Sequence, residues 1–138
     1  MGVESTVVSL IDRPRLLRPG GLAREVIESA LGFALEDAET GGVLHSPGQL
    51  ESHYAPHAAM RLNAVLPEAG EVYLGFGASG GAHNLSPSGD VVEAAANLFR
   101  MLHEIDALKP ERIAVAPIPH SGLGEAINDR LKRAAAPR

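Results

Sequence analysis

The sequence contains no cysteine and no tryptophan, and aromatic residues make up only 4% of its 138 residues. The absence of cysteine excludes disulfides, thiolate zinc sites and cysteine nucleophiles. The scarcity of aromatic side chains argues against a platform on which nucleic-acid bases stack. Acidic residues outnumber basic ones by 17 to 12, and the formal charge of −5 argues against direct binding of nucleic acid through its phosphates.

Long hydrophobic runs are also lacking. No stretch approaches the roughly 18 apolar residues that a membrane-spanning helix needs. The first residues show no basic segment followed by an apolar run, as a secretory signal would. We therefore expect a cytoplasmic protein that does not bind a membrane. Hydrophobic residues nevertheless make up 45% of the chain, which is enough for a folded core.

The N-terminal third predicts a small piece of mixed structure. The β-branched and apolar run 3–10 predicts a strand, and residues 15–18 predict a second, short strand. Apolar residues at helical spacing over 22–31, followed by Gly32, predict a helix with a glycine C-cap. Residues 33–58 show no sustained period, and a stretch of this length is usually a functional loop or a linker.

The rest of the chain has a clearer α/β pattern. We expect strands at 60–63 and 71–76, a loop at 77–90, a helix from Asp90 to Leu108, a strand at 112–119 and a helix at 122–136. The helix that begins at Asp90 carries the strongest apolar periodicity in the chain. An order of strand, helix, strand and helix is typical of an α/β domain with parallel strands.

Two polar groups in the N-terminal third are candidates for binding a ligand. The hydroxyls of Ser5 and Thr6 lie in the first predicted strand, and a structural role is the alternative for both. Arg15 and Arg18 precede the turn Pro19-Gly20-Gly21. An arginine beside glycines can bind a phosphate, because the glycines let the backbone come close. A solvated strand edge is the alternative.

Three further patterns carry weaker signals. His45, His53 and His57 are candidate metal ligands, but no carboxylate lies at a recognisable metal spacing and they are equally typical of a polar loop. The glycine-rich stretch 75–81 lacks the Lys-Ser/Thr ending of a phosphate-binding loop. Ser121 is a candidate N-cap for the last helix.

Several motifs, taken in order along the chain, resemble one family. They are Ser5-Thr6-Val7-Val8, Leu17-Arg18-Pro19-Gly20, Ser46-Pro47-Gly48, Ser52-His53-Tyr54-Ala55-Pro56, the strand 114–119 and the helix 122–131. Together they are similar to the two-domain threonylcarbamoyl-AMP synthases, and the likeness extends over residues 3–138. The His-Tyr-Ala-Pro motif is its most specific part.

The resemblance implies a domain organisation. The family has a YrdC-like catalytic domain, a linker and a C-terminal Rossmann-like domain. By this likeness, residues 1–44 are the last part of the catalytic domain, 45–59 are a gating linker, and 60–138 are the α/β, Rossmann-like accessory domain with a parallel sheet.

The resemblance also implies a reaction. The family joins L-threonine, bicarbonate and ATP into threonylcarbamoyl-AMP and pyrophosphate, usually with Mg²⁺, for the threonylcarbamoyladenosine modification of tRNA. It uses charge and positioning rather than a covalent nucleophile, and no metal ligand of the chain itself is implied. Ser5 is expected to contact threonine, and Arg18 and Tyr54 the nucleotide. His53 and Tyr54 are expected to form the linker gate.

The chain departs from the family pattern at Ser9, where Asp is common, and at Gln49, where Met is common. The basic nucleotide motifs that precede the Ser-Thr strand in the family are missing. The sequence is therefore expected to represent the C-terminal segment of such an enzyme, inactive alone. Apolar faces in residues 1–44 are expected to be exposed or covered by another chain, self-association included. The alternative is a stand-alone module that binds a nucleotide or a protein.

Overall fold

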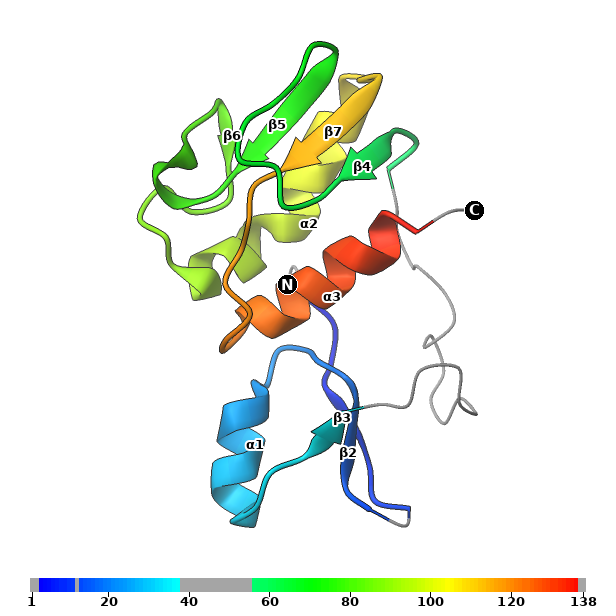
Figure 1. Cartoon of the computed structure of the whole chain (residues 1–138), viewed down its shortest axis with the longest axis vertical. Coiled ribbons are helices and arrows are strands. Elements are labelled where there is room, and N and C mark those ends of the chain that lie inside the picture. Colours follow the sequence, from blue (N-terminus) through cyan, green and yellow to red (C-terminus); the bar gives the residue numbers. More distant parts are fainter. Residues whose placement is uncertain (1–2, 12, 38–55, 137–138) are drawn as a thin grey trace.

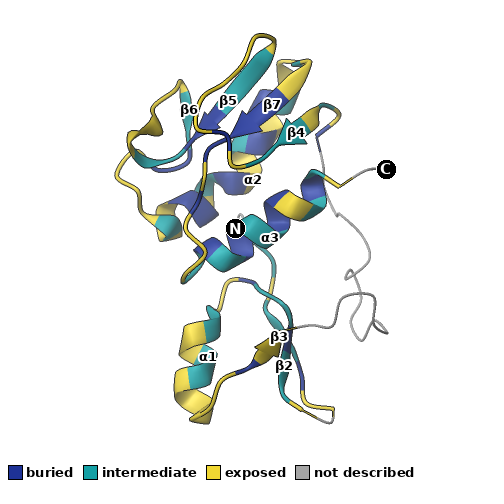
Figure 2. Cartoon of the chain, in the orientation of Figure 1, coloured by how far each residue is buried: buried dark blue, intermediate teal, exposed yellow. Residues whose placement is uncertain are grey.

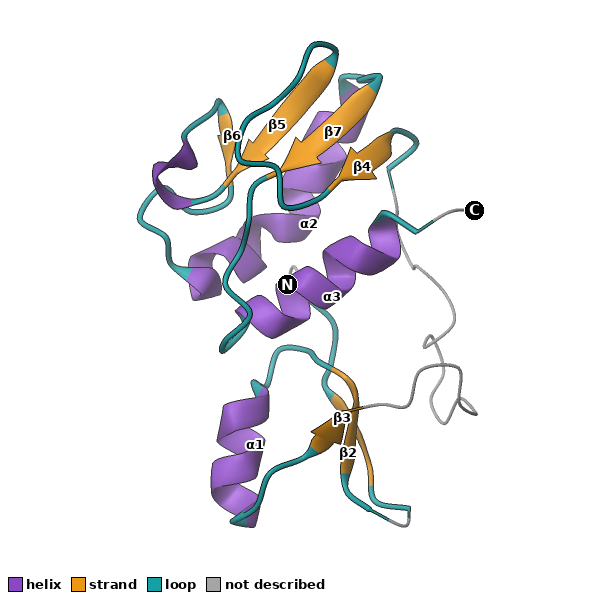
Figure 3. Cartoon of the chain, in the orientation of Figure 1, coloured by secondary structure: helices purple, strands orange, loops and turns teal. Residues whose placement is uncertain are grey.

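The computed structural model describes residues 3–11, 13–37 and 56–136, and places two sheets on either side of the last helix (Figure 1). The first sheet has the strand order β1-β2-β3, with β1 and β2 antiparallel and β2 and β3 parallel. One helix accompanies it (Figure 3). These elements are β1 (Val7–Ser9), β2 (Arg15–Arg18), α1 (Arg24–Leu31) and β3 (Glu36–Asp37).

The second sheet is entirely parallel, with the strand order β4-β7-β5-β6. Its two long helices pack against each other. Its elements are β4 (Ala59–Arg61), β5 (Glu71–Gly75), the short 3₁₀ helix η1 (Gly77–Ser79), β6 (His83–Asn84), α2 (Val91–Ala107), β7 (Arg112–Val115) and α3 (Gly124–Ala134). This arrangement confirms the predicted α/β fold with a parallel sheet.

The hydrophobic core lies between this sheet and the helices α2 and α3. Helix α2 begins where Asp90 accepts a hydrogen bond from the backbone N–H of Val92 at 2.9 Å. Its buried residues follow the predicted spacing and are Ala94, Ala95, Leu98, Leu102 and Ile105. Leu108, which the pattern placed on the same face, is 58% exposed because the helix ends before it.

Helix α1 differs sharply from α2, because none of its residues is buried (Figure 2). Its predicted glycine C-cap is confirmed: Gly32 adopts a φ of 85° and its N–H donates to the Glu28 carbonyl. Several apolar side chains in and around α1 remain open to solvent, as expected for the N-terminal third. Leu22, Val26, Leu31 and Phe33 are all more than 40% exposed.

Several element boundaries differ from the sequence-based expectations. The first strand covers only Val7–Ser9 rather than 3–10, and the last strand ends at Val115 rather than 119. The two-residue strands β3 and β6 and the helix η1 were not expected at all. Strands this short hold few alternating residues, so hydrophobic periodicity does not reveal them.

An ion pair with a buried carboxylate and a partly exposed arginine joins two strands of the parallel sheet. The Glu71 side chain is only 1% exposed, and its two oxygens accept hydrogen bonds from Arg61 Nε at 2.9 Å and Nη2 at 2.8 Å. These bonds hold the pKa of the Glu71 carboxyl at about 2, below its ordinary value of 4.5. The two-point geometry ties β4 to β5 across the intervening strand β7.

The depressed pKa predicts a defined pH dependence of stability. The charged Glu71 stabilises the fold above pH 4.5, and this contribution is lost as the pH falls from 4.5 through about 2. We expect Glu71→Gln to lower the free energy of unfolding at pH 7 and to flatten its decline over that range. Urea unfolding at a series of pH values measures this, with Glu104→Gln as a control for an exposed pair. An unchanged acid profile in Glu71→Gln would contradict the assignment.

Candidate functional site

The structure brings together Ser5 and Arg18, the two described residues that the sequence predicted to bind substrates. Arg18 lies at the end of β2, and its Nε donates a hydrogen bond to the Ser5 carbonyl oxygen at 3.0 Å. The Arg18 side chain is 13% exposed. Ser5 is exposed, and none of the described residues forms a hydrogen bond with its hydroxyl. The hydroxyl is thus open to a ligand beside a largely buried guanidinium.

Ser5 is held in place by the turn that follows Arg18. The Gly21 N–H donates to the Glu4 carbonyl at 2.8 Å, and the Thr6 hydroxyl both accepts from the Leu22 N–H and donates to the Leu22 carbonyl. The Thr6 hydroxyl therefore serves the structure, whereas the Ser5 hydroxyl forms no hydrogen bond with the described residues. A Cβ on Gly20 would lie 2.3 Å from backbone atoms of residues 4–6, so this close approach requires glycine.

A cavity of about 630 Å³ opens next to Ser5. Its lining is mainly apolar and comes from the start of the chain, the turn and α1. The lining residues are Val3, Glu4, Ser5, Thr6, Val8, Gly21, Leu22 and Ile27. Ser5, the residue predicted to bind threonine, thus lies on the wall of an open, apolar cavity rather than in a closed pocket.

Helix α3 makes polar contacts with α1 at its first turn. Arg24 Nε lies 3.2 Å from each Glu125 oxygen, and this bond is the main cause of the raised pKa of Arg24. Glu25 accepts a hydrogen bond from the Gly122 N–H at 3.0 Å, which lowers the pKa of the Glu25 carboxyl. The prediction that Ser121 caps α3 is wrong, because the cap position falls on Leu123 and Glu25 reaches this end from α1.

A second set of contacts links α3 to the chain beside Ser5. The Glu4 carboxylate forms an ion pair with Arg133 and lies 3.8 Å from Arg18 Nη1. Arg133 Nε also donates to Asp129 at 3.0 Å. Burial lowers the pKa of the Arg133 guanidinium, but its carboxylate partners outweigh this and raise it. Burial raises the pKa of the Asp129 carboxyl. No local sequence signal pointed to Glu4 or Arg133.

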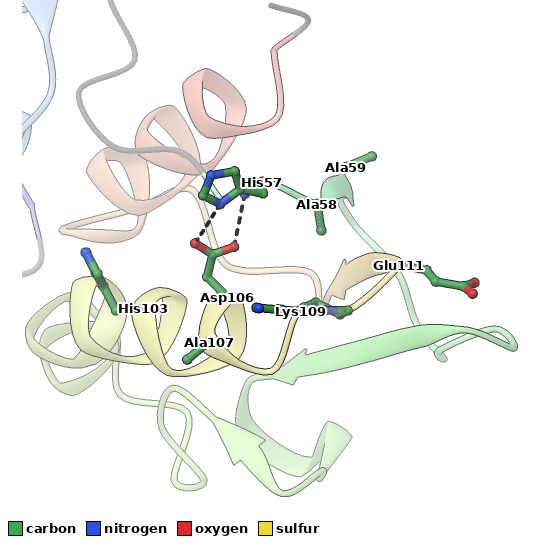
Figure 4. A pocket seen from close by; sticks show the side chains of 9 residues that line it. His57, Ala58, Ala59, His103, Asp106, Ala107, Lys109 and Glu111 are labelled. Atoms are coloured by element: carbon green, nitrogen blue, oxygen red, sulfur yellow. Dashed lines mark hydrogen bonds and ion pairs between the residues drawn. The ribbon is translucent and has the colours of Figure 1, made fainter.

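Two further cavities involve the C-terminal part. One, of about 460 Å³, is lined by residues of β2 and α3 among others, and His120 and Lys132 belong to its lining. The other, of about 640 Å³, lies at the amino ends of β4 and β7, where His57 and Asp106 point toward each other (Figure 4). Open α/β sheets bind ligands at the carboxyl ends of their strands, so this second cavity is at the opposite edge.

The histidines show no metal site within the described ranges. His57 Nδ1 lies 3.3 Å from Asp106, whose other oxygen accepts from the His57 N–H, while His45 and His53 lie outside the described residues. No group of three or more potential ligands with metal-binding geometry occurs among residues 3–11, 13–37 and 56–136.

No helix in these ranges is both long and apolar enough to cross a membrane.

Comparison with known proteins identifies the family. The model of the threonylcarbamoyl-AMP synthase C-terminal domain matches residues 22–136. The chain belongs to this family. The threonylcarbamoyl-AMP synthases of Pyrococcus abyssi and Bacillus subtilis are 34% and 32% identical to it, over the whole chain and over 47% and 46% of their own length. The chain therefore spans about half the length of these relatives and aligns with their C-terminal part.

Comparison with solved structures points to the same family as the sequence comparison. A crystal structure of P. abyssi Sua5 complexed with L-threonine superimposes with a TM-score of 0.77 at 28% identity. The match covers 97% of this chain and 46% of that one. It therefore includes the β1–β3 sheet with Ser5 and Arg18 as well as the parallel sheet.

Three predictions drawn from the resemblance to the threonylcarbamoyl-AMP synthase family concern the gate residues, the domain division and Mg²⁺. The predicted gate residues His53 and Tyr54 lie outside the described residues. The division into 1–44, 45–59 and 60–138 stays a prediction. The carboxylate beside Ser5 and Arg18, Glu4, is paired with two arginines. It therefore does not offer the oxygen ligands that Mg²⁺ requires.

Proposed function

We propose that the chain acts as the C-terminal part of a threonylcarbamoyl-AMP synthase in the cytoplasm. The reaction joins L-threonine, bicarbonate and ATP into threonylcarbamoyl-AMP and pyrophosphate, as a step in tRNA modification. Ser5 is proposed to bind threonine, and Arg18 and Tyr54 to bind the nucleotide, with His53 and Tyr54 in the gating linker. The observation that carries the proposal is the contact between Arg18 and Ser5 in a chain of this family.

The geometry suits a divided task. Arg18 supplies one cation for a phosphate, and the exposed Ser5 hydroxyl beside it supplies a hydrogen-bonding group for an amino acid. One guanidinium alone does not balance the charge of a triphosphate. We therefore propose that the remaining cations come from the N-terminal part of the family fold, which this chain does not span. Alone, the chain is expected to show little or no synthesis.

The apolar surface around α1 supports this division. Leu22 and Val26 are 52% and 55% exposed, and Leu22 also lines the cavity beside Ser5. Apolar surface of this kind is typical of an interface. We propose that the N-terminal part of the synthase covers it and closes the cavity into a binding pocket.

A chimera tests the proposal. In it, this chain replaces the aligned C-terminal part of the Bacillus subtilis relative. We expect pyrophosphate release that requires L-threonine and bicarbonate together with ATP. The 138-residue chain and the N-terminal part of the relative, each assayed alone, serve as controls and are expected to be inactive. A folded but inactive chimera, or full activity of the chain alone, would refute the proposal.

A further inference from the structure

We propose that the cavity of about 460 Å³ beside helix α3 binds a small zwitterion, an α-amino acid with an apolar side chain. This site is separate from the cavity beside Ser5, because the two cavities share no lining residue. The inference goes beyond the proposed function and does not depend on the synthase reaction.

The cavity lies at the edge of the parallel sheet where α/β folds place their ligands. Its lining includes Leu62 and Asn63, which follow β4, and His120, which lies between β7 and α3. Because β4 and β7 are parallel neighbours, these residues mark the carboxyl ends of adjacent strands. Open α/β sheets bind ligands outside these ends.

One side of the cavity carries a positive charge without an ion-pair partner. Lys132, on α3, is exposed and forms no hydrogen bond or ion pair with a described residue. Its charge influences Asp129, but Asp129 is paired with Arg133 at 3.0 Å. The Lys132 ammonium group is therefore available to a carboxylate of a ligand.

The opposite charge is in excess around Arg24, which also lines the cavity. Three carboxylates lie no more than 3.9 Å from the Arg24 guanidinium, those of Glu28, Asp37 and Glu125. In the described part of the chain, none of the three pairs with a second cation. Asp37 and Glu125 belong to the cavity lining, so an ammonium group of a ligand would find uncompensated negative charge there.

Asn128 adds a hydrogen-bond acceptor with a fixed orientation. Its Nδ2 lies 2.8–3.1 Å from three backbone carbonyl oxygens, those of Ile118, Pro119 and Gly124. These acceptors settle which end of the amide is the nitrogen. The Asn128 Oδ1 receives no hydrogen bond from a described residue, and Asn128 lines the cavity, so this oxygen can accept from a ligand N–H.

A ligand that satisfies these groups must carry both charges. A carboxylate suits Lys132, whereas an ammonium group suits Asn128 Oδ1 and the carboxylates around Arg24. The apolar part of the lining consists of Leu16, Leu17, Pro19 and Leu62. These side chains offer contacts to a hydrocarbon group. A phosphate fits less well, because it has no group for the carboxylates.

Titration of the 138-residue chain at neutral pH with L-valine, isovalerate and isobutylamine tests the inference. Isovalerate lacks the ammonium group of valine, and isobutylamine lacks its carboxylate. The NMR signals of the Arg24 Nε–H group and of the Asn128 side-chain amide report binding in the cavity. We expect L-valine to shift both signals and to bind about fivefold or more tightly than either analogue, because a single charge contact in water contributes about this factor.

Two substitutions separate the two ends of the ligand. We expect Lys132→Met to weaken the binding of L-valine and isovalerate about fivefold, and to leave that of isobutylamine within about twofold. Asp37→Asn is expected to weaken the binding of L-valine and isobutylamine but not that of isovalerate. The Asp37 side chain is 83% exposed, so this variant is expected to fold. A merely structural role for either residue would affect all three ligands alike.

The matched control is Lys109→Met, because Lys109 is the only other lysine of the chain and does not line this cavity. It is expected to leave the binding of all three ligands unchanged. The inference is overturned if L-valine shifts neither signal, if isovalerate or isobutylamine binds as tightly as L-valine, or if Lys132→Met behaves like Lys109→Met. The titration measures ligand binding rather than synthesis, so an inactive chimera does not decide it.

Discussion

Replacing Gly20 with alanine is expected to lower the free energy of unfolding by about 3 kcal/mol or more. The new Cβ would lie 2.3 Å from the Glu4 carbonyl oxygen, the Ser5 carbonyl carbon and the Thr6 nitrogen. All three are backbone atoms, so no side-chain rotation relieves the overlap. The start of the chain must separate from the turn, which breaks the hydrogen bond from the Gly21 N–H to the Glu4 carbonyl.

A matched control is Gly32→Ala. Gly32 has a φ of 85°, and a Cβ there meets nothing within 4 Å, so the substitution costs only the backbone strain of a left-handed residue, about 1–2 kcal/mol. Urea unfolding followed by circular dichroism compares the two variants. The Arg18 Nε–H signal should also shift in Gly20→Ala, because its acceptor is the Ser5 carbonyl. Equal destabilisation by the two variants would contradict the role assigned to Gly20.

The sequence predicts the two helices α2 and α3 of the parallel part well, because they are long and regular. Helix α2 shows this: Asp90 is a good N-cap, and the apolar spacing after it matches the buried face from Ala94 to Ile105. The family motifs predict a threonine contact for Ser5 and a nucleotide contact for Arg18, and in the structure the Arg18 Nε donates to the Ser5 carbonyl. The strands β3 and β6 were not predicted, because a strand of two residues cannot show a hydrophobic period.

The features of the candidate site that the sequence did not predict are contacts between residues far apart in the chain. Arg24 and Glu125 are 101 positions apart, and Glu4 and Arg133 are 129 apart. An ion pair leaves no periodic trace in either segment, so one sequence does not reveal it. The failed cap at Ser121 has the same origin, because Glu25, from a different helix, binds the Gly122 N–H. The link between α3 and the candidate site therefore emerged only from the structure.

The double substitution Leu22→Asp/Val26→Asp is expected to lower the activity of the chimera by roughly 100-fold or more. Each side chain is about half exposed in this chain and is proposed to be covered by the N-terminal part of the synthase. Burying one Leu or Val side chain contributes about 1.5–3 kcal/mol, so two buried carboxylates remove that gain and add a desolvation cost. The backbone of Leu22 still binds the Thr6 hydroxyl, so the turn beside Ser5 is retained.

Val92→Asp provides the matched control, because Val92 is 60% exposed on α2 rather than on α1 or the turn before it. Threonine-dependent pyrophosphate release should persist in that variant and fall in the double variant, while circular dichroism shows both chimeras folded.

Sedimentation of the 138-residue chain tests whether a second copy of the chain covers this surface instead. A dimer that Leu22→Asp/Val26→Asp dissociates, combined with an active double-variant chimera, would assign the surface to self-association. If the 138-residue chain is a monomer and the double-variant chimera is inactive, the surface is assigned to the N-terminal part of the synthase, because no second copy of the chain covers it.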